Sequence, residues 1–211
     1  MHSETGIETT PALGRPRSEE AHRAILDAAL RLTADEGYQA VTIKGIAEAA
    51  GVGRQTIYRW WPTKGAIVLE AVRSIARQAA EPEPTGDAVA DLRALLRATF
   101  ALNSSVAGPA ISGLMAESTG DPRFAALLQE QLLAPRRAVV RGILERGQEA
   151  GQLGRATGLD LVVDTVWGTM WYRTLSKHRP VDAALADDVT EAVVRMLGPG
   201  DRPEDTVTMA A

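Results

Sequence analysis

The chain of 211 residues contains no cysteine, and this absence excludes several kinds of chemistry. Disulfide bonds, thiolate metal sites and a cysteine nucleophile all require the missing side chain. The absence fits a reducing compartment, and we expect a cytoplasmic protein. No run approaches the roughly 20 consecutive apolar residues of a membrane span, and residues 1–17 lack the apolar core of a signal peptide. We therefore expect no membrane partner.

Signatures of catalysis are also missing from the sequence. It has no glycine-rich phosphate loop, and no Ser/His/Asp constellation stands out. No His, Asp and Glu residues have metal-ligand spacing, and His22 and His178 stand alone, which predicts that both are exposed. We therefore predict no catalytic residue, no metal and no cofactor. A small α-helical enzyme is the alternative from another class of function.

Acidic residues outnumber basic ones in the whole chain, 27 to 23, but the distribution is uneven. Residues 15–64 carry eight basic and six acidic side chains, whereas residues 65–211 carry 15 and 19. A mildly basic head on an acidic body suits a protein that contacts nucleic acid through its N-terminal part. The asymmetry is small, so it supports this interpretation without deciding it.

Alternating β-branched runs are absent, and apolar residues recur at helical spacing along most of the chain. Gly37 is expected to end the first helix, and the Pro- and Glu-rich residues 81–86 form a linker. The expected helices cover residues 18–36, 42–50, 54–60, 64–80, 87–103, 107–117, 122–133, 136–150, 159–177 and 183–197. We therefore predict an all-α fold with about nine helices.

Two short helices joined by a tight turn are expected in residues 41–64, VTIKGIAEAAGVGRQTIYRWWPTK. Gly51 stands where the first helix must end and the chain must turn, and glycine accepts a positive φ at little cost. Ala47 and Ala50 are small enough for the two helices to approach closely, and Val52 can fill the space between them. This is the layout of a helix-turn-helix, whose second helix enters the major groove of DNA.

The second of these helices carries hydrogen-bond donors suited to DNA, with Ile57 as its inward residue. Arginine can bond a guanine edge and glutamine an adenine edge, which makes Arg54, Gln55 and Arg59 candidate base contacts. Hydroxyl and amine donors are the candidates for phosphate contacts. They are Thr42, Thr56, Tyr58 and Lys64.

Each of these features has a plainer interpretation. The two helices can be a hairpin that merely packs, and Tyr58 alone would more often be a half-buried aromatic. Trp60 and Trp61 are interpreted as packing residues, since tryptophan chiefly contributes buried area. Arg15 and Arg17, just before the first helix, either enter a minor groove as a basic arm or belong to an idle tail. Taken together, residues 41–64 favour DNA binding.

A longer stretch, residues 25–72, reads ILDAALRLTADEGYQAVTIKGIAEAAGVGRQTIYRWWPTKGAIVLEAV. Over about residues 20–72 the chain resembles the DNA-binding domain of the TetR family of bacterial regulators, because several residues match the family pattern at fixed offsets. They are Gly37-Tyr38 at the end of the first helix, then Thr42, Ile46-Ala47, Ala50-Gly51-Val52, Tyr58, and Lys64 after Pro62. It departs from the pattern at Trp60-Trp61, where a smaller residue and Phe or Tyr are more common, and at Gly65, where an acidic residue is common.

The resemblance implies a DNA-binding transcriptional regulator, usually a repressor, that acts on a double-stranded operator as a homodimer. It also implies release by a small-molecule effector, here expected to be largely apolar. The effector would move the helix over residues 65–80 and change the spacing of the recognition helices, which must match half-sites about 34–36 Å apart. A helical adaptor that has lost its DNA contact is the alternative.

The resemblance also implies a division of the chain into domains. We expect a disordered tail with a basic arm (1–17), a helix-turn-helix domain (18–64) and a connecting helix (65–80). A helical regulatory and dimerisation domain (81–198) and a second disordered tail (199–211) follow.

Aromatic residues and methionines in the C-terminal part are the candidates for the effector pocket, because pockets favour apolar and aromatic walls. They are Phe100, Met115, Phe124, Trp167, Met170 and Trp171, with core packing as the alternative. In the resembled family, the last two long helices of each subunit pair with those of its partner in a four-helix bundle. The interface candidates are Val162, Val166, Val189, Val193 and Met196, with a core helix inside one subunit as the alternative for residues 161–175.

Overall fold

A computed structural model describes residues 15–78 and 83–200 of the chain. Its α-helices are α1 (Arg15–Glu36), α2 (Ile43–Ala50), α3 (Arg54–Tyr58), α4 (Lys64–Gln78), α5 (Ala88–Asn103), α6 (Ala107–Gly120), α7 (Pro122–Leu128), α8 (Ala134–Glu149), α9 (Leu159–Ser176) and α10 (Ala183–Leu197). A five-residue π-helical segment, η1 (Gln129–Leu133), joins α7 to α8 without a break. With α7, η1 and α8 counted as one continuous helix, the described residues form nine helices and no β-strand, which confirms the all-α prediction.

Helix α1 begins at Arg15, three residues before its predicted start, and thus extends into the predicted tail. Pro16 falls in the first turn, where its missing N–H has no consequence because these N–H groups lack a partner within the helix. The side chains of Arg15 and Arg17 lie outside the described residues. At the other end, Gly37 has a φ of 82° and ends α1 as predicted.

The turn between α2 and α3 is set by a cap at each end of α2. The Oγ1 of Thr42 accepts a hydrogen bond from the backbone N–H of Gly45 at 3.0 Å. Gly51 ends the helix with a φ of 67°, and the N–H of Val52 then donates to the carbonyl of Ala47 at 3.0 Å. A side chain at position 51 would be strained in this left-handed conformation, so glycine permits the predicted tight turn.

The rod formed by α7, η1 and α8 runs past Pro135, where the sequence predicts two separate helices. In a regular α-helix, proline removes a donor and its ring meets the carbonyl four residues earlier. The π-helical turn is wider, and the N–H of Ala134 donates to the carbonyl of Gln129, five residues earlier. The wider turn accommodates Pro135 in the first turn of α8, so the predicted break is wrong.

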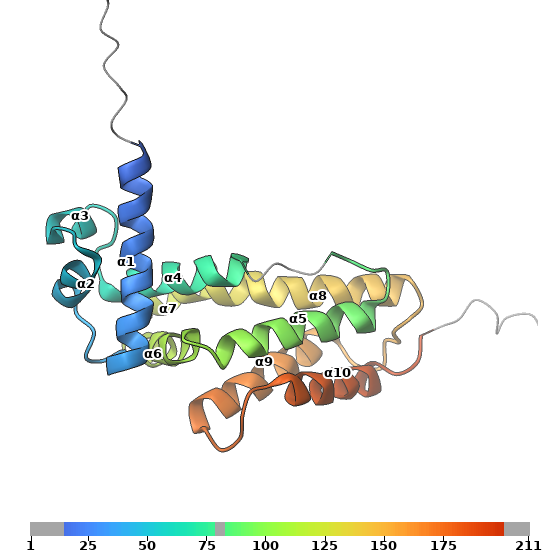
Figure 1. Cartoon of the computed structure of the whole chain (residues 1–211). Coiled ribbons are helices and arrows are strands. Elements are labelled where there is room, and N and C mark those ends of the chain that lie inside the picture. Colours follow the sequence, from blue (N-terminus) through green and yellow to red (C-terminus); the bar gives the residue numbers. More distant parts are fainter. Residues whose placement is uncertain (1–14, 79–82, 201–211) are drawn as a thin grey trace, which may run out of the picture.

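Helix α1 crosses one end of an elongated bundle that contains α5, α8, α9 and α10, and α2 and α3 lie on the opposite side of α1 (Figure 1). We call α1–α3 the head and α5–α10 the body; α4 connects them. One cluster of buried side chains joins the head and α4 to α6 and α7, and a second joins α5, α8, α9 and α10. The core of the head is therefore continuous with that of the adjoining body helices.

Candidate nucleic-acid interface and effector cavity

Helix α3 presents polar side chains around a single buried residue, Ile57, which is 0% exposed. The exposed side chains here are Arg54, Gln55, Tyr58 and Arg59, and Thr56 is half-buried. Tyr58 is 57% exposed, so it is not the half-buried aromatic of the plainer interpretation. Within the described residues, the side chains of Arg54 and Gln55 form no hydrogen bond or ion pair, so their donors face solvent unpaired. The structure thus brings the predicted donors of this helix together on one surface.

The two tryptophans after α3 anchor it on α1 and α4. Trp61 is buried, and its Nε1 donates to Oε2 of Glu70 at 2.6 Å. His22 of α1 lies 2.9 Å from Oε1 of the same carboxylate, and its ring centre lies 5.0 Å from that of Trp61. The prediction that Trp61 is a packing residue is confirmed, whereas the prediction of an isolated, exposed His22 is wrong. Glu70 is 48 residues from His22, and such a separation leaves no local signal in the sequence.

Thr42 and Lys64 flank the recognition surface and already have partners in the chain. The hydroxyl of Thr42 accepts the capping bond of α2, and its hydrogen is still available to a phosphate. The ammonium of Lys64 donates to the carbonyls of Tyr38 and Gln39 at 2.9 and 3.3 Å. Since an ammonium has three donors, one donor of Lys64 is left for a phosphate.

Close contacts fix the head on α6. The hydroxyl of Tyr38, in the loop after α1, donates to Oε2 of Glu117 on α6. The Tyr38 ring lies on Gly113, where an added Cβ would stand 2.1 Å from the ring's Cγ. A Cβ on Gly65 would stand 2.5 Å from Oε1 of Glu117, which explains why the acidic residue common at this position in the resembled family has no space here.

The Tyr38 phenol is buried next to the Glu117 carboxylate, and both features affect its pKa. Burial of the phenol raises its pKa above the ordinary value, and the hydrogen bond to Glu117 and the charge of that carboxylate raise it further. Tyr38 is 5% exposed, so the phenol stays protonated in the folded protein well into the alkaline range. The neutral hydroxyl therefore remains a donor to α6.

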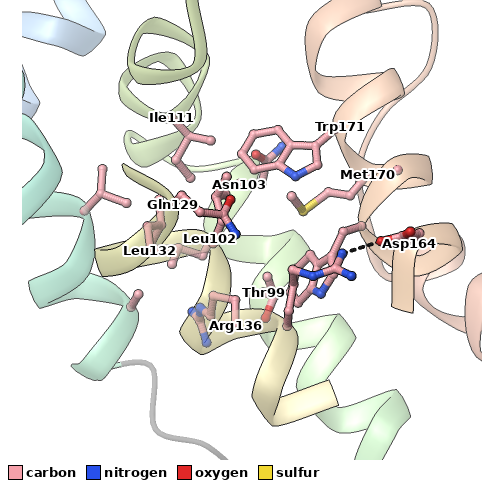
Figure 2. Close-up of a pocket in the computed structure, with 16 residues that line it drawn as sticks. Thr99, Leu102, Asn103, Ile111, Gln129, Leu132, Arg136, Asp164, Met170 and Trp171 are labelled. Carbon is pink, nitrogen blue, oxygen red and sulfur yellow. Dashed lines mark hydrogen bonds and ion pairs between the residues drawn. The ribbon is translucent and has the colours of Figure 1, made fainter. Parts of the chain in front are cut away.

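A cavity of about 590 Å³ lies in the body and reaches α4 (Figure 2). Six helical segments supply its wall: α4, α5, α6, η1, α8 and α9. Among the predicted pocket residues, Trp167, Met170 and Trp171 line it. The other three pack elsewhere: Phe100 in the second core cluster, Phe124 in the first, and Met115 against the first.

Polar groups interrupt the apolar wall of this cavity. Oδ1 of Asn103 and Nε1 of Trp167 are buried and have no hydrogen-bond partner among the described residues. The amide nitrogen of Asn103 donates to Oγ1 of Thr174 at 3.0 Å, which leaves the amide oxygen as the unpaired atom. Arg137 and Asp164 form an ion pair in the wall (Figure 2). Sequence patterns did not single out Asn103, because its role depends on helices packed around it.

Family models cover both parts of the chain. Residues 25–71 match the model described as bacterial regulatory proteins of the tetR family, and residues 82–193 match the tetracyclin repressor-like C-terminal domain. The chain belongs to the TetR family. It is accordingly a helix-turn-helix transcriptional regulator, and the alternative of a small enzyme is set aside.

Relatives within the TetR family share most of the chain. The uncharacterized HTH-type transcriptional regulator YdeS of Bacillus subtilis is 32% identical over 87% of this chain and 89% of its own length. The solved TetR family transcription regulator SCO0332 is 29% identical, with a TM-score of 0.68 over 85% of this chain and 100% of that chain. The repressor KstR of Mycolicibacterium smegmatis is 37% identical over 60 residues, 28% of this chain and 29% of the repressor.

The described residues of this TetR-family chain contain no helix long and apolar enough to cross a bilayer. They also hold no group of three or more His, Cys, Asp or Glu side chains placed to bind a metal ion.

The valines predicted to form the dimer interface are buried inside one subunit. Val162, Val166 and Val193 are 0% exposed and Val189 is 5% exposed, all within the second core cluster, and Met196 packs against that cluster. These valines have no surface left for a second copy, so their assignment to the interface is corrected. The apolar stripe was correctly recognised, but periodicity alone cannot tell a stripe that faces the subunit's own core from one that faces a partner.

Proposed function

We propose that this TetR-family regulator is a dimeric repressor that leaves its operator when a small molecule occupies the cavity of the body. The observation that carries the DNA-binding part is the surface of α3, where exposed donors surround the single buried Ile57. Arg54, Gln55 and Arg59 contact base edges. The phosphate contacts come from Thr42, Thr56, Tyr58 and the remaining donor of Lys64. Arg15 and Arg17 enter the adjacent minor groove.

A second copy of the chain covers the outer face of α9. Leu161, Tyr172 and Leu175 are 59%, 67% and 53% exposed, an unusual amount for large apolar side chains. Together with Thr165 and Gly168 they follow helical spacing and lie on one face of α9. An added Cβ on Gly168 meets no atom within 4 Å, so a partner helix can approach closely at this position, which also borders the effector cavity. Pairing of two such faces places two recognition helices on one operator.

The two unpaired polar atoms support a polar effector group in the cavity. A buried donor or acceptor without a partner costs about 1–3 kcal/mol. Nε1 of Trp167 needs an acceptor and Oδ1 of Asn103 needs a donor. A molecule with a largely apolar body and one hydroxyl or amide group supplies both, and its volume must fit within about 590 Å³.

Two helices carry the effector signal to the head. Val72 of α4 lines the cavity, and Lys64 at the start of α4 holds the loop of Tyr38. Ile111 of α6 also lines the cavity, and Glu117 on the same helix accepts the hydrogen bond of Tyr38. An effector that displaces α4 or α6 therefore moves the head, and it releases DNA when it prefers the displaced arrangement.

A gel-shift experiment with DNA from upstream of the encoding gene tests the proposal. Wild-type protein is expected to bind, and Arg54→Ala and Tyr58→Ala are expected to bind more weakly, by about 1–3 kcal/mol for a base-contacting arginine. Arg155→Ala is the matched control, since this exposed arginine lies between α8 and α9, away from the head. Unchanged binding by both α3 variants would contradict the assignment of α3 as the recognition helix.

A further inference from the structure

Another cavity, of about 610 Å³, lies where the head meets the body, and no residue of α3 lines it. Gly37 in the loop after α1, Ser112 of α6 and Arg179 between α9 and α10 are among the residues around it, and we call this space the junction cavity. The elements that carry them meet at one end of the bundle (Figure 1). The volume of the junction cavity is within the range of small-molecule sites, about 300–1,000 Å³.

The wall of the junction cavity carries three positively charged side chains. Arg173 belongs to the last turn of α9, Lys177 is the residue that ends this helix, and Arg179 follows two positions later. The described residues that line the cavity include no aspartate or glutamate. Cations near the C-terminus of a helix complement its dipole, and this effect accounts for Arg173 and Lys177. It does not account for Arg179, which lies beyond the helix.

Most donors of this cluster are available to a ligand. The side chains of Lys177 and Arg179 form no hydrogen bond or ion pair with any other described residue. Nη1 of Arg173 donates to the carbonyl of Pro180 at 3.1 Å, and this uncharged acceptor leaves further donors of the guanidinium for an anion. The half-buried hydroxyl of Ser112 also has no hydrogen bond within the described parts of the chain. Like charges around one space repel each other, and an anion among them removes the repulsion and accepts charge-assisted hydrogen bonds.

Two hydrogen bonds hold the walls of the junction cavity together. The amide nitrogen of Asn103 donates to Oγ1 of Thr174 at 3.0 Å, and the hydroxyl of Ser104 donates to the carbonyl of Val181. Between these contacts the chain turns at Lys177, whose φ of 54° is the one positive φ outside glycine in the described ranges 15–78 and 83–200. Asparagine or glycine adopts this conformation more readily than lysine. A lysine at a position that disfavours it supports a role for its charge.

We infer that the junction cavity binds a small phosphate-bearing anion between the head and the body. A phosphate group carries roughly 1.5 to 2 negative charges at neutral pH and offers three strong acceptor oxygens, which suits a cluster of cations beside a hydroxyl donor. The volume of the cavity also admits the organic part of a phosphate monoester. This ligand is separate from the effector, although Asn103 lines both cavities.

A set of matched probes tests the charge requirement. Ribose 5-phosphate and ribose share a skeleton and differ in charge, and inorganic phosphate supplies the charged group alone. Isothermal titration calorimetry at low salt measures their affinities. Ribose 5-phosphate is expected to bind about tenfold or more tightly than ribose, with inorganic phosphate between them. Equal binding of ribose and ribose 5-phosphate would overturn the inference, and so would the absence of binding by both phosphates at millimolar concentration.

Variants of the cavity wall locate the site. Lys177→Asn/Arg179→Gln removes two exposed charges, and asparagine tolerates the positive φ, so the fold should be kept. This variant is expected to bind ribose 5-phosphate about tenfold or more weakly. Ser112→Ala keeps every charge and should weaken binding by about two- to tenfold.

Two control variants remove a cation elsewhere. Arg54→Ala changes the surface of α3, and Arg155→Gln lies before the start of α9, whereas the junction cavity lies at the end of that helix. Both should bind ribose 5-phosphate as the wild type does. Wild-type binding by Lys177→Asn/Arg179→Gln, or an equal loss in Arg54→Ala, would place the phosphate elsewhere and contradict the inference.

The phosphates of the operator compete for the same interpretation of Lys177 and Arg179. In phosphate-free buffer, Lys177→Asn/Arg179→Gln should bind DNA from upstream of the encoding gene with the affinity and salt dependence of the wild type. A lower affinity with a salt slope reduced by about 2 would show that these side chains contact the DNA backbone, and it would overturn the inference. The calorimetric experiments need no operator, so they test the junction cavity even if the proposed function is wrong.

Discussion

Residues 54–59 place four exposed polar side chains around one buried isoleucine, all within a single short segment. The effector cavity takes its wall from six helical segments spread between Val72 and Trp171. The surface of α3 depends on residues that are close together in the sequence. The effector cavity depends on the packing of helices that are far apart in the sequence. The DNA-reading surface can therefore keep its shape while the cavity changes, and a signal must pass through the elements that contact both the head and the cavity, namely α4 and α6.

The largest effect is expected from a charge on the outer face of α9, because two copies must pair before two heads can bind one operator. Tyr172→Asp or Leu161→Asp places an unpaired carboxylate in the proposed interface, at a cost of about 3–5 kcal/mol. Sedimentation at micromolar concentration should then show monomers in place of dimers, with operator binding weakened in parallel.

The control for this change is Val106→Asp. Val106 is 55% exposed, like the residues on α9, but it lies between α5 and α6. This variant should remain dimeric. Dimers of Tyr172→Asp with the stability of the wild-type dimer would show that the partner covers a different face.

A smaller effect is expected where the head meets the body. Gly113→Ala places a Cβ against the Tyr38 ring, and such overpacking should lower the free energy of unfolding by about 1–3 kcal/mol. Gly120→Ala on the same helix meets no atom within 4 Å, so it should be neutral or stabilise by up to about 1 kcal/mol. Urea denaturation measures both. Equal stabilities would mean that the head is not held against α6 at Gly113.

The smallest effect concerns pH. Because the pKa of Tyr38 is raised in the folded protein, the unfolded chain loses its phenol proton first as pH rises. Stability from this group is complete below about pH 10, the ordinary tyrosine pKa, and falls above it by up to about 1.4 kcal/mol per pH unit. Unfolding midpoints between pH 9 and 11 should therefore fall more steeply for wild type than for Tyr38→Phe. Parallel slopes would contradict the buried phenol–carboxylate contact.

Local sequence patterns predicted the head well. Gly51 at the turn and Ile57 as the inward residue each depend on neighbours within a few positions. The same reasoning missed the bond between His22 and Glu70, because the two residues meet through the packing of α1 on α4.

The body was predictable in outline and not in detail. The helices of the body follow from periodicity, but the faces they bury depend on which neighbours surround them. Val162 and Val166 therefore pack inside the subunit, while Leu161 and Tyr172 of the same helix face outward. The unpaired oxygen of Asn103 likewise becomes apparent once the helices are packed together.

DNA reading by α3 is tested most directly by the affinity of the protein for a set of operator fragments that differ by one base pair each. Wild type should discriminate at several positions. Arg54→Ala should lose about 1–3 kcal/mol on the best fragment and lose its discrimination at one position in each half-site. Arg155→Ala should match the wild type at every position. If Arg54→Ala loses the same affinity for every fragment, Arg54 contacts a phosphate and does not read a base. If it loses no affinity for any fragment, α3 does not read DNA through Arg54.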